Sequence, residues 1–215
     1  GKYWERVICR VAAADYILVR PSTDYGTSQT VYYLSRTGVV GTQELLFSVN
    51  GGEYWKAGNS SALAMSDLAS DGDNTVYATS LTQATVSKDN GWTWSLPVSN
   101  KTSSTGAGQT MITTLRNANP DGPAGYVFVG GDSGSCFVSY STNGGSSFTR
   151  VTNTAFPTVG DLKIAPHSAY ETNNTIFVAG TAGRIGRWVI GKSTVWSTLT
   201  NPLGALYGGL VCSSD

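Results

Sequence analysis

Three aspartates occupy positions from which carboxylates could carry out acid–base chemistry. Each one precedes a short apolar run by a residue or so, and they are Asp15, Asp67 and Asp161. If these runs are strands that begin at one end of the fold, two carboxylates could serve as acid and base on a glycosidic bond. The alternative, which we favour, is that each aspartate accepts hydrogen bonds from backbone N–H groups at a strand start.

Three large aromatic side chains could provide flat surfaces for sugar rings. They are Trp92, Trp188 and Tyr207. Aromatic rings bury a large apolar area and keep a polar edge, so they suit both ligand contacts and core positions. Core packing is the interpretation that we favour for each of them.

The supply of metal-binding side chains is small. The chain has one histidine, His167, and three cysteines, Cys9, Cys136 and Cys212. The cysteines lie far apart and lack the C-x-x-C spacing that is typical of zinc sites. We therefore predict no metal site and no cofactor, and we interpret His167 as a loop residue. The cysteine count is consistent with one disulfide plus a free thiol, or with three buried thiols.

The charge balance argues against nucleic acid or a membrane as the partner. The 215 residues include 14 basic and 14 acidic side chains, and charged residues make up 13% of the chain. No overall field therefore attracts an anionic polymer. No apolar run approaches the roughly 18 residues of a membrane-spanning helix. Low charge with many Ser, Thr and Tyr residues favours a secreted or cell-surface protein.

A turn motif that reads Ser-x-Asp/Asn-x-Gly-x-x-aromatic occurs three times. In this pattern Asp or Asn accepts hydrogen bonds from its own turn, and Gly takes a positive φ. The closing aromatic ring then covers the turn. The residues that carry the motif are Ser48, Asn50, Gly52 and Trp55; Ser87, Asp89, Gly91 and Trp94; and Ser141, Asn143, Gly145 and Phe148.

This motif resembles the Asp-box, also called the BNR repeat. A degraded fourth copy runs to Trp196, and residues 1–4, which end at Trp4, match residues 52–55. In the families that carry Asp-boxes, these turns lie away from the catalytic face. The resemblance therefore implies that the motif residues are structural.

The spacing of the motif predicts the architecture. The closing aromatics at 55, 94, 148 and 196 are 39, 54 and 48 residues apart. Similar strand-like runs precede the turns, at residues 30–33, 75–78, 126–129 and 175–178. Four strands in such a unit form the blade of a β-propeller. We predict an all-β fold, a propeller of four-stranded antiparallel blades with Asp-box turns.

The predicted organisation is a single propeller portion over residues 1–215, with about four full blades and two partial ones. The full blades are expected at 11–58, 59–100, 101–153 and 154–201, between the end of a preceding blade at 1–10 and the start of a next blade at 202–215. On this interpretation the chain is an incomplete part of a larger propeller. The remaining blades would come from the same polypeptide or from a second chain.

The resemblance implies several functions. Sialidases with Asp-boxes carry an Arg-Ile-Pro motif, whereas Arg184-Ile185-Gly186 lacks the proline, so we do not expect a sialidase. We expect a non-enzymatic extracellular or cell-surface scaffold, or a module that binds a protein or glycan partner. The alternatives are a glycoside hydrolase with aspartates at the channel mouth, as in xyloglucan-cleaving propellers, and a sortilin-like receptor that takes peptides into its channel.

Overall fold

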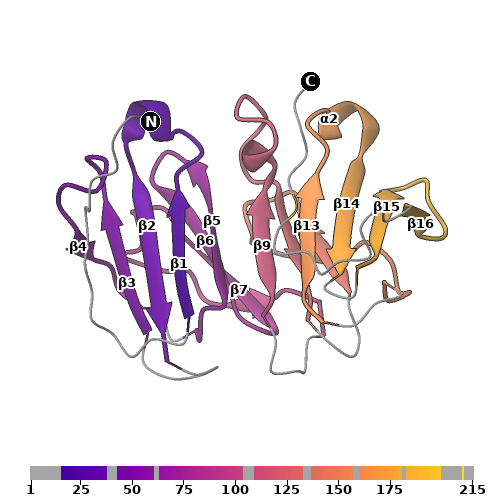
Figure 1. The fold of residues 1–215 in the computed structure, drawn as a ribbon, viewed down its shortest axis with the longest axis horizontal. Coiled ribbons are helices and arrows are strands. Elements are labelled where there is room, and N and C mark those ends of the chain that lie inside the picture. Colours follow the sequence, from indigo (N-terminus) through magenta and orange to yellow (C-terminus); the bar gives the residue numbers. More distant parts are fainter. Residues whose placement is uncertain are drawn as a thin grey trace.

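Strands dominate the part of the chain that the structure describes. The computed structural model describes residues 16–37, 43–60, 63–103, 109–132, 137–156, 160–180, 183–199 and 210. The strands form four separate sheets, each with four strands (Figure 1). The predicted all-β fold of four-stranded antiparallel sheets is confirmed.

Each sheet is built from four strands that follow one another along the chain. The first sheet contains β1 (Tyr16–Pro21), β2 (Val31–Arg36), β3 (Gln43–Ser48) and β4 (Lys56–Ala57). The second contains β5 (Asp67–Gly72), β6 (Thr75–Thr79), β7 (Gln83–Ser87) and β8 (Val98–Ser99). The third contains β9 (Met111–Thr114), β10 (Val127–Gly130), β11 (Val138–Ser141) and β12 (Thr149–Arg150). The fourth contains β13 (Leu162–Pro166), β14 (Thr175–Gly180), β15 (Ile185–Val189) and β16 (Ser197–Leu199).

Short helical turns join the first two strands in three of the sheets. They are α1 (Tyr25–Ser28), the 3-10 turn η1 (Leu115–Asn117) and α2 (Tyr170–Asn173). Both α1 and α2 end at a left-handed residue, Gln29 with φ 50° and Asn174 with φ 49°. The two connections therefore share one backbone design, although they lie in different sheets.

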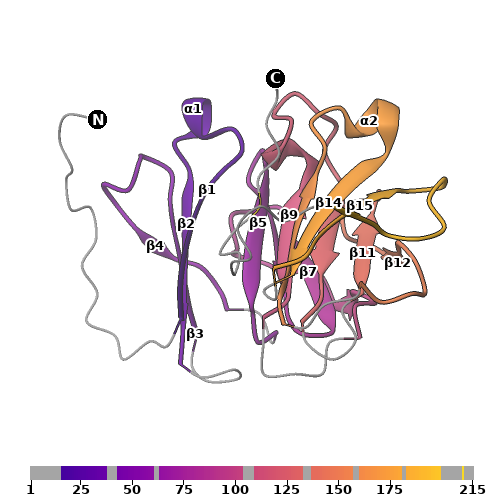
Figure 2. The ribbon, with the colours of Figure 1, turned by 45° about the vertical axis from the view of Figure 1, so that its right-hand side comes forward.

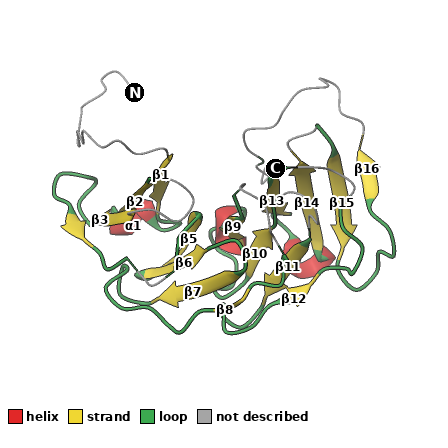
Figure 3. Ribbon diagram, turned by 90° about the horizontal axis from the view of Figure 1, so that it is seen from below, coloured by secondary structure: helices red, strands yellow, loops and turns green. Residues whose placement is uncertain are grey.

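The four sheets stand side by side around an arc. Figure 3 shows the first strands β1, β5, β9 and β13 on its inner side, and the short fourth strands on its outer side. Figure 2 shows the same sheets from the side, with the first sheet at one end of the row. The inner strands therefore surround a common axis, as the repeat predicts.

The core consists of three apolar clusters between neighbouring sheets. Because successive side chains of a strand point to opposite faces, one strand serves two clusters. In β6, Val76 and Ala78 pack toward the first sheet, whereas Tyr77 packs toward the third. The largest cluster joins the third and fourth sheets around Phe128 and Trp188. Each sheet is thus stabilised by its neighbours along the chain.

The three predicted turn motifs form the same hydrogen bonds. In the first, the Ser48 hydroxyl donates to Asn50 Oδ1 at 2.8 Å, and the Gly52 N–H donates to Ser48 Oγ at 2.9 Å. The corresponding distances are 2.7 and 2.8 Å at Ser87, and 2.9 and 3.0 Å at Ser141. The degraded fourth turn differs, because the Val189 N–H donates to Ser193 Oγ at 3.0 Å.

The closing aromatics of the described turns lie against the body of the protein. The Trp94 indole packs on the first cluster, and its N–H donates to the Asn59 carbonyl at 2.7 Å. Phe148 is buried in the second cluster, and Trp196 packs on the third, with its ring centroid 5.0 Å from that of Phe156. Trp55 meets Tyr33 edge to face at 6.4 Å. Trp4 lies outside the described residues.

Candidate functional site

The inner strands bring a group of polar side chains together where β5 begins. Asp67, the first residue of β5, is fully buried. Its Oδ1 accepts hydrogen bonds from Arg20 Nη2 at 3.1 Å and from the Leu68 N–H at 2.9 Å. Its Oδ2 accepts from the Ile112 N–H of β9 at 3.0 Å. One carboxylate therefore ties three inner strands, β1, β5 and β9, to one another.

The environment of Asp67 affects its protonation in two opposing ways. Burial raises the pKa of this carboxyl above its ordinary value, because a charged group loses its hydration. The Arg20 charge and the N–H groups of Ile112 and Leu68 act in the other direction. The Arg20 side chain is 37% exposed and carries the nearest positive charge toward solvent. Solvent and ligands thus reach Arg20, whereas Asp67 itself is shielded.

Asp161 makes a similar link on the other side of β9. It directly precedes β13, and its Oδ1 accepts a hydrogen bond from the Gln109 N–H at 2.8 Å. Unlike Asp67, Asp161 is partly exposed. Both aspartates thus bind the backbone of another inner segment, in addition to any role at a strand start. Asp15, the third candidate, lies outside the described residues.

Tyr16 and Arg36 complete this group, which we call the channel-mouth cluster (Tyr16, Arg20, Arg36, Asp67 and Asp161). The Arg36 guanidinium carbon lies 4.9 Å from the Tyr16 ring centroid. Burial first, and then the Asp67 charge, raise the pKa of Tyr16 to about 12, and Asp161 acts in the same direction. Tyr16 is thus neutral at physiological pH, and its environment links residues of the first, second and fourth sheets.

The cluster is better suited to holding strands together than to acid–base catalysis. An acid–base pair must reach the bond that it cleaves. Asp67 has no exposed surface, and both of its oxygens already accept hydrogen bonds. Asp161 is the carboxylate of this cluster that a ligand can approach. The geometry therefore favours the hydrogen-bonding interpretation for Asp67.

The predicted aromatic contacts lie in different environments. Trp188 is buried in the cluster between the third and fourth sheets, with its ring centroid 4.9 Å from that of Trp196. Trp92 is 52% exposed and meets Phe47 of the first sheet edge to face at 5.8 Å. Tyr207 lies outside the described residues. Of the described pair, Trp92 presents a surface that a partner can touch.

A second buried carboxylate was not among the predicted site residues. Asp71, near the end of β5, accepts hydrogen bonds at Oδ2 from the Gly125 N–H at 2.6 Å and from Tyr77 Oη at 3.2 Å. Burial raises the pKa of Asp71, although these bonds and Arg116 oppose it. The short sequence Ser70-Asp71-Gly72 is typical of a polar loop, so it gives little sign that the aspartate is buried.

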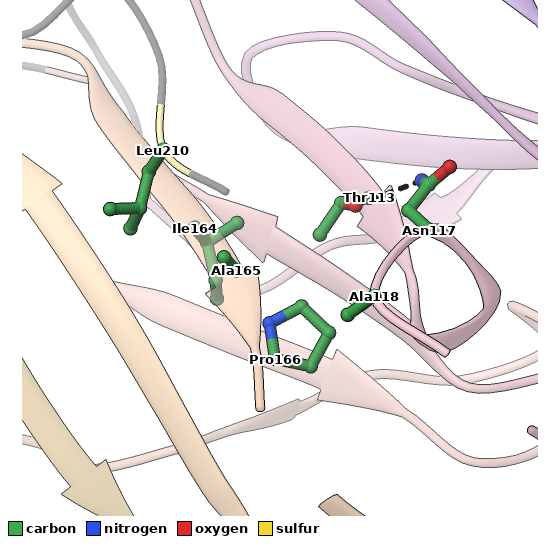
Figure 4. A pocket seen from close by; sticks show the side chains of 7 residues that line it. All are labelled: Thr113, Asn117, Ala118, Ile164, Ala165, Pro166 and Leu210. Atoms are coloured by element: carbon green, nitrogen blue, oxygen red, sulfur yellow. Dashed lines mark hydrogen bonds between the residues drawn. The ribbon is translucent and has the colours of Figure 1, made fainter. Parts of the chain in front are cut away.

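A small apolar cavity lies between β9 and β13. It has a volume of about 60 Å³. Figure 4 shows Leu210, Ile164 and Pro166 among its lining residues, with Thr113 and Asn117 joined by a hydrogen bond of 2.9 Å. This volume accommodates a water molecule or a small side-chain group, but it is far below the ~300 Å³ of an ordinary ligand pocket.

Two searches of the described residues bear on metals and membranes. In that part of the chain, no group of three or more His, Cys, Asp or Glu side chains is arranged to hold a metal ion. None of the described helices has the length and apolar character that spanning a membrane requires.

Comparison with known proteins identifies the fold. No protein-family model and no curated protein matches the sequence. Among solved structures, a nidogen/laminin complex matches with a TM-score of 0.56 and 13% identity, over 80% of this chain and 61% of that one. An ancestral GH74 enzyme matches with a TM-score of 0.57 and 16% identity, over 88% of this chain and 24% of that one.

A third match is the GH74 xyloglucanase from Xanthomonas campestris. Its TM-score is 0.54 and its identity 16%, over 80% of this chain and 29% of that one. The chain thus spans less than two thirds of the length of each of these three structures. At such identities the likeness concerns the fold alone. Together with the four sheets around one axis, it confirms the predicted β-propeller fold.

Proposed function

We propose that the chain is a non-enzymatic β-propeller with Asp-box turns, which works outside the cell or at its surface as a scaffold that binds a protein partner. The observation that carries this proposal is the state of Asp67. The carboxylate expected at the channel mouth is fully buried and bonded to the backbone of two inner strands. It supports the arrangement of blades and is not available to a substrate.

The assignment of the turns to the Asp-box class rests on their hydrogen bonds. In all three, Asp or Asn Oδ1 also accepts the N–H of the residue four positions later, at 3.1, 2.8 and 3.1 Å. The acceptors are Asn50, Asp89 and Asn143. A repeated sequence motif with one repeated bonding pattern is what a structural turn repeat requires.

The proposal of a protein partner rests on exposed aromatic surface. Trp residues dominate the energetics of many protein interfaces. The half-exposed Trp92 is fixed by its edge contact with the buried Phe47, so a partner meets an already ordered ring. One of the similar propellers occurs in a nidogen/laminin complex. An extracellular location agrees with the low content of charged residues.

One observation favours glycoside hydrolysis as a second candidate function. Asp161 is partly exposed and influences Tyr16, which places it at the channel mouth. The GH74 likeness provides a precedent for hydrolysis on this fold, although fold does not determine function. For this candidate, a second carboxylate within reach of the substrate would be needed.

Turnover measurements separate the two candidates. We expect no release of reducing sugar from xyloglucan or from other plant and microbial polysaccharides. Release that is abolished by Asp161→Asn, and retained in the exposed control Asp121→Asn, would refute the non-enzymatic proposal. The protein-binding proposal is tested by crosslinking partners at the cell surface and identifying them. Their recovery should fall with Trp92→Ala and persist with Leu96→Ala, an exposed apolar control.

A further inference from the structure

The fourth sheet shows how a blade receives the blade before it. Leu162 and Ile164 of β13 and Tyr170 of α2 are buried, with exposed fractions of 0, 6 and 3%. They belong to the cluster that also contains Phe128 and Leu115 of the third sheet. The Phe128 and Tyr170 rings meet edge to face, with centroids 5.0 Å apart. We call this surface of a sheet its incoming face.

The first sheet carries the same incoming face, but it is exposed. When Pro21 is matched with Pro166, Ile17 and Val19 of β1 correspond to Leu162 and Ile164 of β13. Tyr25 of α1 corresponds to Tyr170 of α2, because each is the first residue of its helix. Ile17, Val19 and Tyr25 are 57, 52 and 40% exposed. Their counterparts are buried, so an apolar interface surface remains open to solvent here.

The opposite face of each sheet presents an aromatic ring from its second strand. Tyr32 and Tyr77 occupy this position in the first and second sheets, and Phe128 in the third. Each is at most 3% exposed and packs toward the following sheet. In the fourth sheet the corresponding residue is Phe177 of β14, which is only partly buried. We call this surface the outgoing face.

We propose that the outgoing face of the fourth sheet in one copy of the chain packs on the incoming face of the first sheet in a second copy. The two surfaces match because the three sheet-to-sheet interfaces inside the chain join one outgoing face to one incoming face. This proposal is independent of the partner and the activity discussed above. The occupant of the exposed face is therefore a blade of the same chemistry.

The arc of the molecule is compatible with a closed pair. The incoming face of β1 and the outgoing face of β14 lie at opposite ends of the arc (Figure 3). Two copies placed head to tail form two identical contacts, so the assembly closes instead of growing into a filament. The pair would hold eight sheets, which lies within the range of about four to eight blades that propellers use.

Molecular mass in solution tests the proposal directly. At about 100 μM, well above a micromolar Kd, light scattering on the eluting chain should give twice 22.6 kDa. Val19→Glu places a charge on the incoming face, and Phe177→Glu does so on the outgoing face. Each should weaken the dimer by at least ~30-fold, the usual effect of losing a central apolar contact. Leu96→Glu is the matched control and should leave the dimer intact, because Leu96 is 88% exposed.

Mixing the two variants separates this head-to-tail contact from a symmetric one. The intact outgoing face of Val19→Glu can still bind the intact incoming face of Phe177→Glu, so the mixture should recover a dimer held by one contact. If Phe177→Glu does not fold by circular dichroism, Arg187→Glu replaces it, since Arg187 pairs with Phe177 across the sheet and is exposed. A monomeric wild-type chain at this concentration, a dimer that tolerates both substitutions, or failure of the mixture to associate would each overturn the proposal.

Discussion

At the scale of single residues, Asp67 shows how a polar group strengthens the inner wall of the arc. Its two oxygens accept three hydrogen bonds, and the donors come from β1, β5 and β9. Polar groups without partners are expensive in a buried site, so these bonds depend on one another. The residue is therefore important for stability even though it does not face a ligand.

We expect Asp67→Asn to lower the free energy of unfolding by about 1–3 kcal/mol. Both carboxylate oxygens face N–H donors, so the amide NH₂ of asparagine must point at a donor in either orientation. Urea unfolding followed by fluorescence measures the change. The exposed Asp121→Asn serves as the control and should alter stability by less than ~0.5 kcal/mol. Equal stability of Asp67→Asn and the wild type would show that these bonds contribute nothing.

The pH dependence of the same variant gives a second expectation. Burial raises the pKa of Asp67, so the folded protein holds this proton more tightly than the unfolded chain does. The contribution of Asp67 to stability is therefore complete below its ordinary pKa of 3.8 and decreases as pH rises through the raised value. Since asparagine does not titrate, the stability difference between wild type and Asp67→Asn should be larger at acidic than at neutral pH. Unfolding curves across this range measure it.

At the scale of elements, the turns between the third and fourth strands fasten one sheet to the previous one. In the second sheet, Asn90 and Gly91 both take positive φ values, 60° and 90°. The Tyr32 hydroxyl donates to Asn90 Oδ1 at 2.8 Å, and the Gly91 carbonyl accepts the Asn59 N–H at 2.8 Å. These partners belong to the first sheet and its exit, so the turn shape also determines the contact between sheets.

Gly91→Ala should therefore cost more than the strain of its backbone alone. A Cβ at this position would lie 2.7 Å from Leu45 Cδ2, and φ is +90°. Overpacking typically costs ~1–3 kcal/mol, in addition to ~1 kcal/mol for the left-handed backbone. Gly191→Ala is the matched control, because Gly191 has φ +80° and open space around its Cβ position. If thermal unfolding shows equal losses in the two variants, the Leu45 contact does not matter.

At the scale of the whole molecule, stability is a chain of contacts between neighbouring sheets. The three apolar clusters lie between the first and second, the second and third, and the third and fourth sheets. Repeat architectures of this kind gain stability from nearest-neighbour interfaces. A defect in one interface should therefore have its strongest effect on the two sheets that share it.

Phe128→Ala tests this distribution. The ring is fully buried between the third and fourth sheets, so its removal should cost about 3–5 kcal/mol. Hydrogen exchange should accelerate most in β9–β11 and β13–β15, and least in the first sheet. Leu34→Ala in the first cluster is the reciprocal control, with its largest effect on the first and second sheets. Uniform acceleration across all four sheets would contradict the nearest-neighbour model.

Much of the fold could be predicted from the sequence, because each unit repeats a local pattern. The Ser-x-Asp/Asn-x-Gly turn bonds within itself, as at Ser141 and Asn143, so its residues encode its shape without help from the rest of the chain. Strand pairing then follows from the short turns. The αL position of Asn90 could also have been inferred, since Gly51 and Gly144 stand at the matching positions.

The candidate site was less accessible to prediction. The sequence placed Asp67 and Asp161 at strand starts, and the structure shows which neighbouring backbone each one binds. Arg20, Tyr16 and Asp71 were not singled out, because nothing in their local sequence reveals burial or a partner from another sheet. The Arg20–Asp67 pair joins residues 47 positions apart, and such contacts depend on how the sheets are stacked.

The sequence alone determined the turns, the strand order and the all-β class, because these features depend on interactions between residues that are close together along the chain. The tertiary structure decided which carboxylate is buried, which aromatic ring is exposed and which blade face is left open. Burial is a property of what packs against a surface, and Ile17 and Leu162 show this clearly. They occupy equivalent positions in two sheets, yet one is 57% exposed and the other is fully buried.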